Sequence, residues 1–191
     1  MNKPVQARTL KTRAKLIDAA KAVVAESGYE ALRVEEVVQR AGVAKGTFFA
    51  HFRDKDALMD QLLGAQLREI LDDIAAGPQP RTAAEMVTAL APLIAFATSE
   101  RYVFDVVIRH SGAAAITEIG PIALAFEQQF RLSLQWVTHP DLPVRDDIPP
   151  ELLAEGIGAF LIQAISLAFC ALHSSVSVEE RLEPYLRAWL R

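Results

Sequence analysis

Apolar residues along this chain recur at the three- and four-residue spacing of amphipathic helices, and no stretch alternates in the manner of a β-strand. In the first such stretch the shared face holds four residues: Leu16, Ala19, Ala20 and Val23. Glycine and proline separate the stretches, as expected at helix ends. The pattern predicts an all-α protein of about nine helices, over residues 9–27, 34–41, 44–52, 54–76, 82–98, 102–110, 121–138, 150–174 and 178–190.

The stretch 41–55 combines a small turn with a short second helix. Ala41 and Gly42 are small where two helices must approach, and Phe48 and Phe52 lie four apart, so they share an inward face. Such a turn lets two helices cross steeply, and the second can then enter a DNA major groove. We therefore predict two domains: a three-helix helix-turn-helix module over 1–55, and a second helical domain over 56–191. The turn by itself is also compatible with a plain helical bundle.

Charge is distributed unevenly along the chain. The net charge is −4, but residues 1–63 hold 11 Lys and Arg against 8 Asp and Glu, whereas 64–191 hold 9 against 16. A basic head on an acidic body fits a module that faces phosphate, although a solvated basic surface gives the same counts. Four basic residues near the N-terminus, in a loose arm or at a solvated helix start, could add DNA contacts: Arg8, Lys11, Arg13 and Lys15.

The remaining composition limits the class of protein. The chain is 51% hydrophobic and 23% charged, as in globular proteins, and its one cysteine, Cys170, cannot form an intramolecular disulfide. The N-terminus has no apolar signal-peptide core, so we expect a cytoplasmic protein. The four histidines are scattered and no phosphate loop follows a strand. We expect no enzyme, no catalytic residues, no metal and no cofactor.

Residues 10–60 resemble the N-terminal segment of the TetR family of bacterial transcription regulators. The matching positions are Ile17, Ala20, Gly28, Tyr29, Val34, Val37, Ala41, Gly42, Val43, Lys45, Gly46, Thr47, Phe48, Phe49, His51, Phe52, Lys55 and Leu58. The chain departs from the family at three of the expected DNA-facing positions, because Ala44 stands where serine is usual, Phe49 where tyrosine is common and Arg33 where threonine often opens the second helix. The full set expected to contact DNA is Arg33, Ala44, Lys45, Thr47, Phe49, Ala50, His51 and Lys55.

A protein that reads DNA through such a module normally pairs as a two-fold dimer. Residues 156–178 carry no charge, and a helix that is apolar all round must be covered, here by a partner subunit. A membrane span is the competing interpretation, disfavoured by Gln163, Ser166 and His173 and by acidic flanks; we expect no membrane. The expected interface residues are Gly158, Ile162, Ile165, Phe169, Leu186 and Trp189.

The resemblance implies that 56–191 is a ligand-binding and dimerisation domain, with a ligand pocket enclosed by the middle helices. The candidate lining residues are Phe96, Phe104, Ile108, Arg109, Phe126, Phe130, Gln163 and Cys170. The polar residues Gln163, Ser166, Cys170 and His173 share one face of the predicted helix 150–174 and could line this pocket. Core hydrogen bonds or a polar seam between subunits explain the same spacing.

These observations favour a dimeric, ligand-responsive DNA-binding regulator. The resemblance implies a repressor that binds a palindromic operator through residues 33–55, and a mostly apolar pocket favours a hydrophobic or amphipathic effector. Its expected partners are double-stranded DNA, a second copy of the chain and a small-molecule effector. The alternatives are a DNA-binding protein without a ligand and a helical enzyme.

Overall fold

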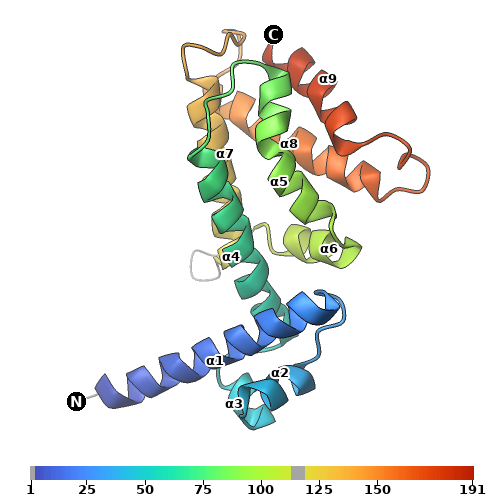
Figure 1. Cartoon of the computed structure of the whole chain (residues 1–191). Coiled ribbons are helices and arrows are strands. Elements are labelled where there is room, and N and C mark those ends of the chain that lie inside the picture. The colour runs from blue at the N-terminus through green and yellow to red at the C-terminus, as the bar shows by residue number, and fades with distance from the viewer. Residues whose placement is uncertain (1–2, 113–118) are drawn as a thin grey trace.

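The computed structural model describes residues 3–112 and 119–191, and every regular element in those ranges is a helix (Figure 1). The all-α prediction is therefore confirmed for the described residues. The helices are α1 Lys3–Ser27, α2 Val34–Ala41, α3 Lys45–Phe49, α4 Lys55–Ala75, α5 Ala83–Thr98, α6 Arg101–Arg109, α7 Pro121–Val137, α8 Pro150–Ala168 and α9 Val178–Leu190.

The first three helices form a small head with its own apolar centre. Leu16 and Phe48 are fully buried there, and Phe52 is nearly so. Gly42 ends α2 in the left-handed conformation, with φ of 66°, and its N–H donates to Gln39 O. This conformation suits glycine, and it turns the chain sharply from α2 into α3.

α4 runs from the head into the body and lies against α7 (Figure 1). Gly64 of α4 faces the start of α7 so closely that a Cβ at this position would lie 2.5 Å from the Pro121 carbonyl carbon. A second close approach joins α8 to α9, where Gly156 faces the Trp189 ring and the Trp189 indole Nε1 donates to Leu153 O at 3.1 Å. Small residues thus let the body helices approach each other.

Three predicted helix boundaries were wrong. α1 begins at Lys3, six residues before the predicted start, so of the two alternatives for Arg8 and Lys11 the solvated helix start is the one observed. α3 ends at Phe49, three residues before the predicted end. α8 ends at Ala168, six residues before the predicted end, and Cys170 begins a run of turns. The four-residue polar stripe is therefore not a helix face, because Cys170 and His173 lie beyond the helix end.

Among the described residues, α8 is the one helix long and apolar enough to cross a bilayer. It contacts α7, α9 and α5, and residues such as Leu153 and Ile157 are fully buried within the chain. A core helix passes the same test of length and composition, so this finding alone is weak support for a span.

Candidate functional site

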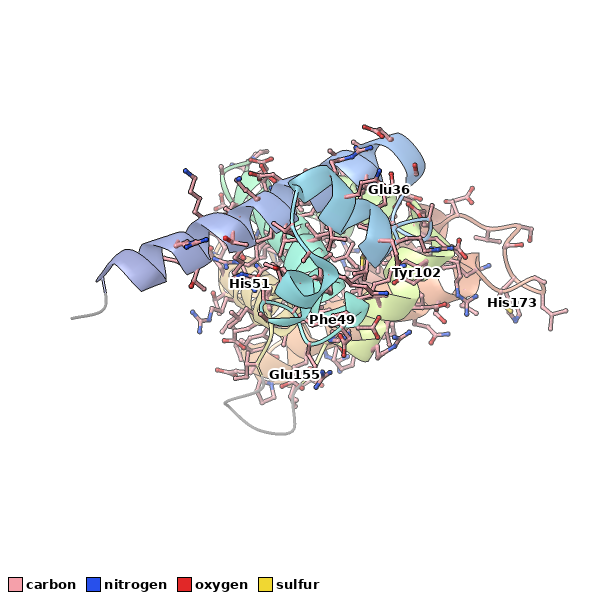
Figure 2. The ribbon with its side chains drawn as sticks, turned by 90° about the horizontal axis from the view of Figure 1, so that it is seen from below. Glu36, Phe49, His51, Tyr102, Glu155 and His173 are labelled. Carbon is pink, nitrogen blue, oxygen red and sulfur yellow. The ribbon has the colours of Figure 1, made fainter. Side chains whose placement is uncertain are left out.

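α3 presents a small surface at the end of the head. Its inward residue Phe48 is fully buried, with the ring 5.5 Å from that of Phe52. On the other side Lys45 and Ala50 are exposed. Phe49 also lies on the outside of the head (Figure 2), with 50% of its surface accessible. Anchoring by the two buried rings fixes the direction of the exposed side chains.

The start of α3 lacks a side-chain cap. Ala44 occupies the N-cap position with extended backbone, and its side chain caps no N–H group; its carbonyl accepts from Thr47 N at 2.9 Å. The free N–H groups at this end of α3 remain available to an external acceptor such as a phosphate oxygen.

Lys45 is held by a carboxylate of the neighbouring helix. Its Nζ lies 2.5 Å from Glu35 Oε1, and this hydrogen bond lowers the pKa of the Glu35 carboxyl below its usual range. Both side chains are more than half exposed, so the pair contributes little to stability and can be exchanged for another anion.

The other expected cations lie at different places. Lys55 points toward the body, with Nζ 4.8 Å from the Tyr102 ring centroid, and burial followed by the nearby Arg33 charge lowers its pKa. Arg33 remains exposed and donates to Glu30 O at 2.8 Å. The structure thus brings Lys45, Phe49 and Ala50 together on one surface and places Lys55 at the junction between head and body.

Arg13 has a positional role that the sequence interpretation missed. Its Nη1 donates to His51 O at 2.9 Å, its Nη2 donates to Gln61 Oε1 at 2.8 Å, and its guanidinium covers the Phe52 ring at 4.3 Å. Arg13 therefore fixes α1 to the turn between α3 and α4. One feature of the sequence could have indicated this role: Arg13 lies three residues before Leu16 and therefore beside the apolar face of the helix.

The junction between head and body is polar. Glu100, the residue before α6, accepts from Tyr29 N at 2.9 Å and from Glu30 N at 3.0 Å. At the other end of α6, Arg109 Nη1 lies 2.6 Å from Asp56 Oδ2 of α4. α6 is therefore bonded at one end to the turn that follows α1 in the head and at the other end to the first turn of α4.

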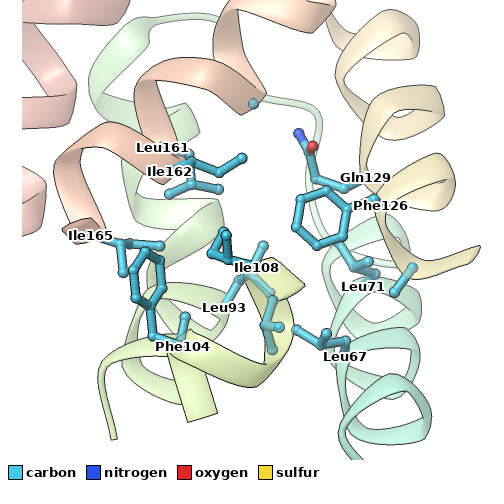
Figure 3. Close-up of a pocket in the computed structure, with 14 residues that line it drawn as sticks. Leu67, Leu71, Leu93, Phe104, Ile108, Phe126, Gln129, Leu161, Ile162 and Ile165 are labelled. Atoms are coloured by element: carbon cyan, nitrogen blue, oxygen red, sulfur yellow. The ribbon is translucent and has the colours of Figure 1, made fainter. Parts of the chain in front are cut away.

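The body contains an apolar cavity of about 60 Å³ between α4, α5, α6, α7 and α8 (Figure 3). Its lining residues are Leu67, Leu71, Leu93, Ala97, Phe104, Val107, Ile108, Ala125, Phe126, Gln129, Gly158, Leu161, Ile162 and Ile165. Gln129 is the one polar side chain in this described lining, and its Nε2 donates to Ser133 Oγ at 2.8 Å. The lining carries no charge, so the cavity suits a neutral group.

Three of the expected lining residues, Phe104, Ile108 and Phe126, lie on the cavity wall. Five do not. Phe96 packs on Tyr29, Arg109 pairs with Asp56, Gln163 is exposed, Cys170 follows the end of α8, and half-buried Phe130 lies outside the lining. Helical spacing showed which residues share a face, but not which neighbour that face meets.

The expected interface residues face inward within the single chain. Gly158, Ile162 and Ile165 line the cavity. Leu186 is fully buried, and the Phe169 ring lies 5.6 Å from that of Phe104. Trp189 is bonded to the Leu153 carbonyl, as described above. The exposed residues of these two helices are Pro150, Glu151, Leu152, Glu155, Ala159, Gln163, Ser166, Glu179, Glu180, Pro184, Arg187 and Ala188.

Comparison with known proteins agrees with this geometry. Residues 16–62 match the model described as bacterial regulatory proteins, tetR family. The A-factor receptor protein of Streptomyces griseus is 36% identical over 61 residues, which is 32% of this chain and 22% of that protein. The fatty acid metabolism regulator protein of Bacillus subtilis is 33% identical over 57 residues, 30% of this chain and 29% of the relative. The chain thus spans less than a third of the length of these curated relatives.

Solved structures share the fold over nearly the whole chain. The repressor FadR of Thermus thermophilus, in complex with lauroyl-CoA, has a TM-score of 0.64 at 18% identity and covers 93% of this chain and 92% of its own. RolR in complex with resorcinol has a TM-score of 0.66 at 20% identity, with 96% and 89% covered. The names of other relatives that share sequence include an HTH-type transcriptional repressor of Mycobacterium tuberculosis, 44% identical over 46 residues, 24% of this chain and 25% of that protein. Residues 16–62 are thus similar to the tetR family of bacterial regulatory proteins, and the chain shares its fold with the solved structures.

Proposed function

We propose that this protein is a dimeric, ligand-responsive transcription regulator, acting as a repressor, with a DNA-binding domain over 1–55 and a ligand-binding and dimerisation domain over 56–191. The observation that carries the proposal is the exposed surface of α3, where Lys45 and Phe49 stand beside a helix start without a side-chain cap. A short exposed helix of this kind fits the major groove of DNA.

Lys45 and Thr47 are the residues proposed to read bases. The Lys45 ammonium leaves Glu35 and donates to guanine or to a phosphate, while Thr47 offers a hydroxyl or a methyl group. Phe49 presents an exposed ring beside them and lacks the hydroxyl that a tyrosine at this position would direct to a phosphate.

The remaining proposed contacts are to the DNA backbone. Arg33 is exposed and can turn to a phosphate, and Ala44 and Ala50 allow close approach of the backbone. His51 and Lys55 are proposed to position the head on the duplex without specifying sequence. Lys55 must first leave the Tyr102 ring.

Two heads are needed to read a palindromic operator, whose half-sites lie about one DNA turn apart. The surface proposed for pairing is the outward side of α8 and α9. Leu152 is 49% exposed there, and Ala159 and Ala188 are exposed as well. A partner subunit would cover these apolar side chains, which lie among polar ones.

The proposed effector site is the apolar cavity of the body. Its volume of about 60 Å³ holds only a few water molecules, so a larger ligand must displace side chains such as Phe126 or Ile162. A ligand that binds only the widened body shifts the population toward that state. The absence of charged lining residues favours a neutral apolar ligand, or an amphipathic one whose polar end stays outside.

α6 and α4 are proposed to transmit this change to the head. α6 supplies Phe104 and Ile108 to the cavity wall. It is bonded to the head through Glu100 and to the first turn of α4 through Arg109. Widening the cavity moves the wall residues and with them the bonded ends of α6. The distance between the two heads then no longer matches successive major grooves.

Selection from a random-sequence DNA pool tests the proposal. We expect an inverted repeat to be enriched, bound more weakly as salt rises, and no longer bound by the double variant Lys45→Ala, Thr47→Ala. The control is Arg68→Ala, which removes an exposed cation from α4 in the body and should leave binding unchanged. If no sequence is enriched at low salt, α3 does not read DNA and the proposal fails.

A further inference from the structure

The apolar cavity of the body has one polar end. Gln129 of α7 is the one polar side chain among its described lining residues. Figure 3 shows the amide of Gln129 beside α8, at the opposite end of the cavity from Leu67 and Phe104. In a mostly apolar pocket, a few polar groups fix the orientation of a ligand and decide which ligands bind. The position of this amide therefore bears on the class of ligand that the cavity accepts.

The polar end lies where the cavity wall is least buried. The lining residues that keep some exposure are Ile108, Phe126, Gln129, Gly158 and Ile162, and all but Ile108 belong to α7 and α8. The lining residues from α4 and α5 are all buried: Leu67, Leu71, Leu93 and Ala97. A ligand would thus place its apolar body against α4 and α5 and a polar group at the end between α7 and α8.

The amide of Gln129 keeps a free acceptor. Its Nε2 donates to Ser133 Oγ at 2.8 Å, one turn further along α7, and Ser133 is only 1% exposed. This hydrogen bond uses the donor side of the amide and leaves the oxygen Oε1. Within the part of the chain that the structure describes, no group donates to Oε1. An amide oxygen has two lone pairs, so this atom can accept a hydrogen bond from a ligand.

Gly158 of α8 faces this oxygen and leaves space in front of it. A Cβ at Gly158 would lie 3.1 Å from Gln129 Oε1, which is close to the donor–acceptor distance of a hydrogen bond. The backbone does not require glycine here, because the described glycines with positive φ are Gly28 and Gly42. Inside a helix glycine is less favourable than alanine. The missing side chain therefore leaves a place for a donor atom of a ligand.

The surroundings limit which donor can occupy this place. None of the described lining residues is charged, so a carboxylate or an ammonium group would lose its hydration without gaining a counter-ion. An ether or a ketone oxygen carries no hydrogen and cannot donate to Oε1. A hydroxyl group is neutral and supplies the donor that the site lacks.

We propose that Gln129 Oε1 determines the specificity of the proposed effector site by accepting a hydrogen bond from the hydroxyl of a neutral, otherwise apolar ligand, an alcohol or a phenol. The hydroxyl oxygen occupies the space that Gly158 leaves open, and the apolar body of the ligand lies against α4 and α5. The inference rests on the proposed function, since it names the class of ligand for the same cavity.

The test measures the binding of three isomers to the full chain without DNA, by titration calorimetry. Para-cresol carries a phenolic hydroxyl, benzyl alcohol an aliphatic one, and anisole an ether oxygen without a donor. Isomers have nearly the same volume, so each must widen the cavity of about 60 Å³ to a similar extent, and this cost cancels in the ratio of their dissociation constants. Benzoate, an anion of similar size, is the fourth probe.

Two variants change the acceptor, each in a different way. Gln129→Met keeps the length of the side chain but removes Oε1, and the Ser133 hydroxyl can then donate to the backbone carbonyl one turn earlier. Gly158→Ala places a methyl group in front of Oε1 in a helix that favours alanine, so it serves as the test if Gln129→Met does not fold. Gln135→Met is the matched control, because it removes an exposed amide from the same helix.

We expect the wild type to bind para-cresol or benzyl alcohol roughly tenfold more tightly than anisole, and benzoate more weakly than either. The tighter of the two hydroxyl isomers identifies the ligand as a phenol or an alcohol. In Gln129→Met and Gly158→Ala the hydroxyl is desolvated without a partner, so the preference over anisole should fall to one or below. Gln135→Met should keep it. A role of Gln129 in folding alone would weaken all the isomers alike and leave their ratio unchanged.

Wild-type protein that binds anisole as tightly as the hydroxyl isomers, or binds benzoate best, would overturn the inference. A preference retained in Gln129→Met would do the same, and so would no detectable binding of either hydroxyl isomer. Since no DNA is present, these outcomes do not depend on operator selection. A hydroxyl preference in a protein that enriches no DNA sequence refutes the proposed regulator and leaves the site, so the two failures are distinguishable.

Discussion

The contact of Glu100 with the head offers a direct test of how head and body are joined. Its carboxylate accepts from Tyr29 N and Glu30 N, in the turn that follows α1. The same side chain makes no cap for its own helix α6. The change Glu100→Ala removes both acceptor oxygens and leaves the packing of the two domains otherwise intact.

The magnitude follows from the exposure of the two donors. The Glu30 N–H bond is exposed, so water replaces the carboxylate there at little cost. The Tyr29 N–H bond is partly buried, and a buried donor without a partner costs about 1–3 kcal/mol. With a discount for its partial exposure, we expect a destabilisation of about 1–2 kcal/mol, which is a factor of about 5–30 in the opening equilibrium of this turn.

Amide hydrogen exchange measures this opening at the two residues concerned. We expect the exchange of Tyr29 N–H and Glu30 N–H to accelerate in Glu100→Ala, by about 5–30-fold at Tyr29. Amides in the body, such as that of Leu153, should be unchanged. Glu100→Gln retains one acceptor oxygen and should give an intermediate effect.

Glu69→Ala is the matched control, because Glu69 is an exposed carboxylate on α4 away from the junction. If exchange at Tyr29 and Glu30 is the same in Glu100→Ala and in Glu69→Ala, the carboxylate does not hold this turn in solution. The proposed route from cavity to head through α6 would then lack one of its two bonded ends.

Three further changes test the head and the body. Glu35→Gln should strengthen operator binding about two- to fivefold, because it removes an exposed ion pair of about 0.5–1 kcal/mol that competes with DNA for Lys45. Titration with the operator measures this affinity, and an unchanged value would contradict the competition. Phe49→Tyr should strengthen binding to every operator variant alike, by one phosphate hydrogen bond of about 1 kcal/mol, and a gain confined to one sequence would argue for a base contact instead. Gly64→Val should lower the free energy of unfolding by more than about 2 kcal/mol in denaturant titration, since even its Cβ would lie 2.5 Å from the Pro121 backbone; a stable variant would show that α4 and α7 are not in close contact.

The presence and order of the three helices of the head were predictable from local sequence, although the start of α1 and the end of α3 were not. The apolar spacing around Leu16, the small residues at Ala41 and Gly42, and the aromatic pair Phe48 and Phe52 are all contained within the head itself. A helix-turn-helix unit buries its apolar faces mostly against itself, so periodicity and turn chemistry describe it well.

The end of α8 and the role of Arg13 were not predictable in this way. The apolar run continues past Ala168, but the chain turns at Cys170, because the helix end depends on what lies beside it. Arg13 looked like one more cation of a basic tail, yet its guanidinium is fixed by His51 and Gln61, distant in sequence. No local pattern records a contact across 48 residues.

The all-helical class and the position of the small turn before α3 could thus be established from the amino-acid sequence, since both follow from the spacing of apolar residues and from glycine chemistry. Which apolar faces enclose the cavity, and which remain outside, became evident only from the packing of the helices. Ile162 and Ile165 lie on the cavity wall although their spacing equally allowed a subunit interface. The physical reason is that spacing along the chain places residues on one side of a helix but does not say which element packs against that side. The packing partner is fixed by the approach of helices distant in the chain, as at Gly64 and Gly156.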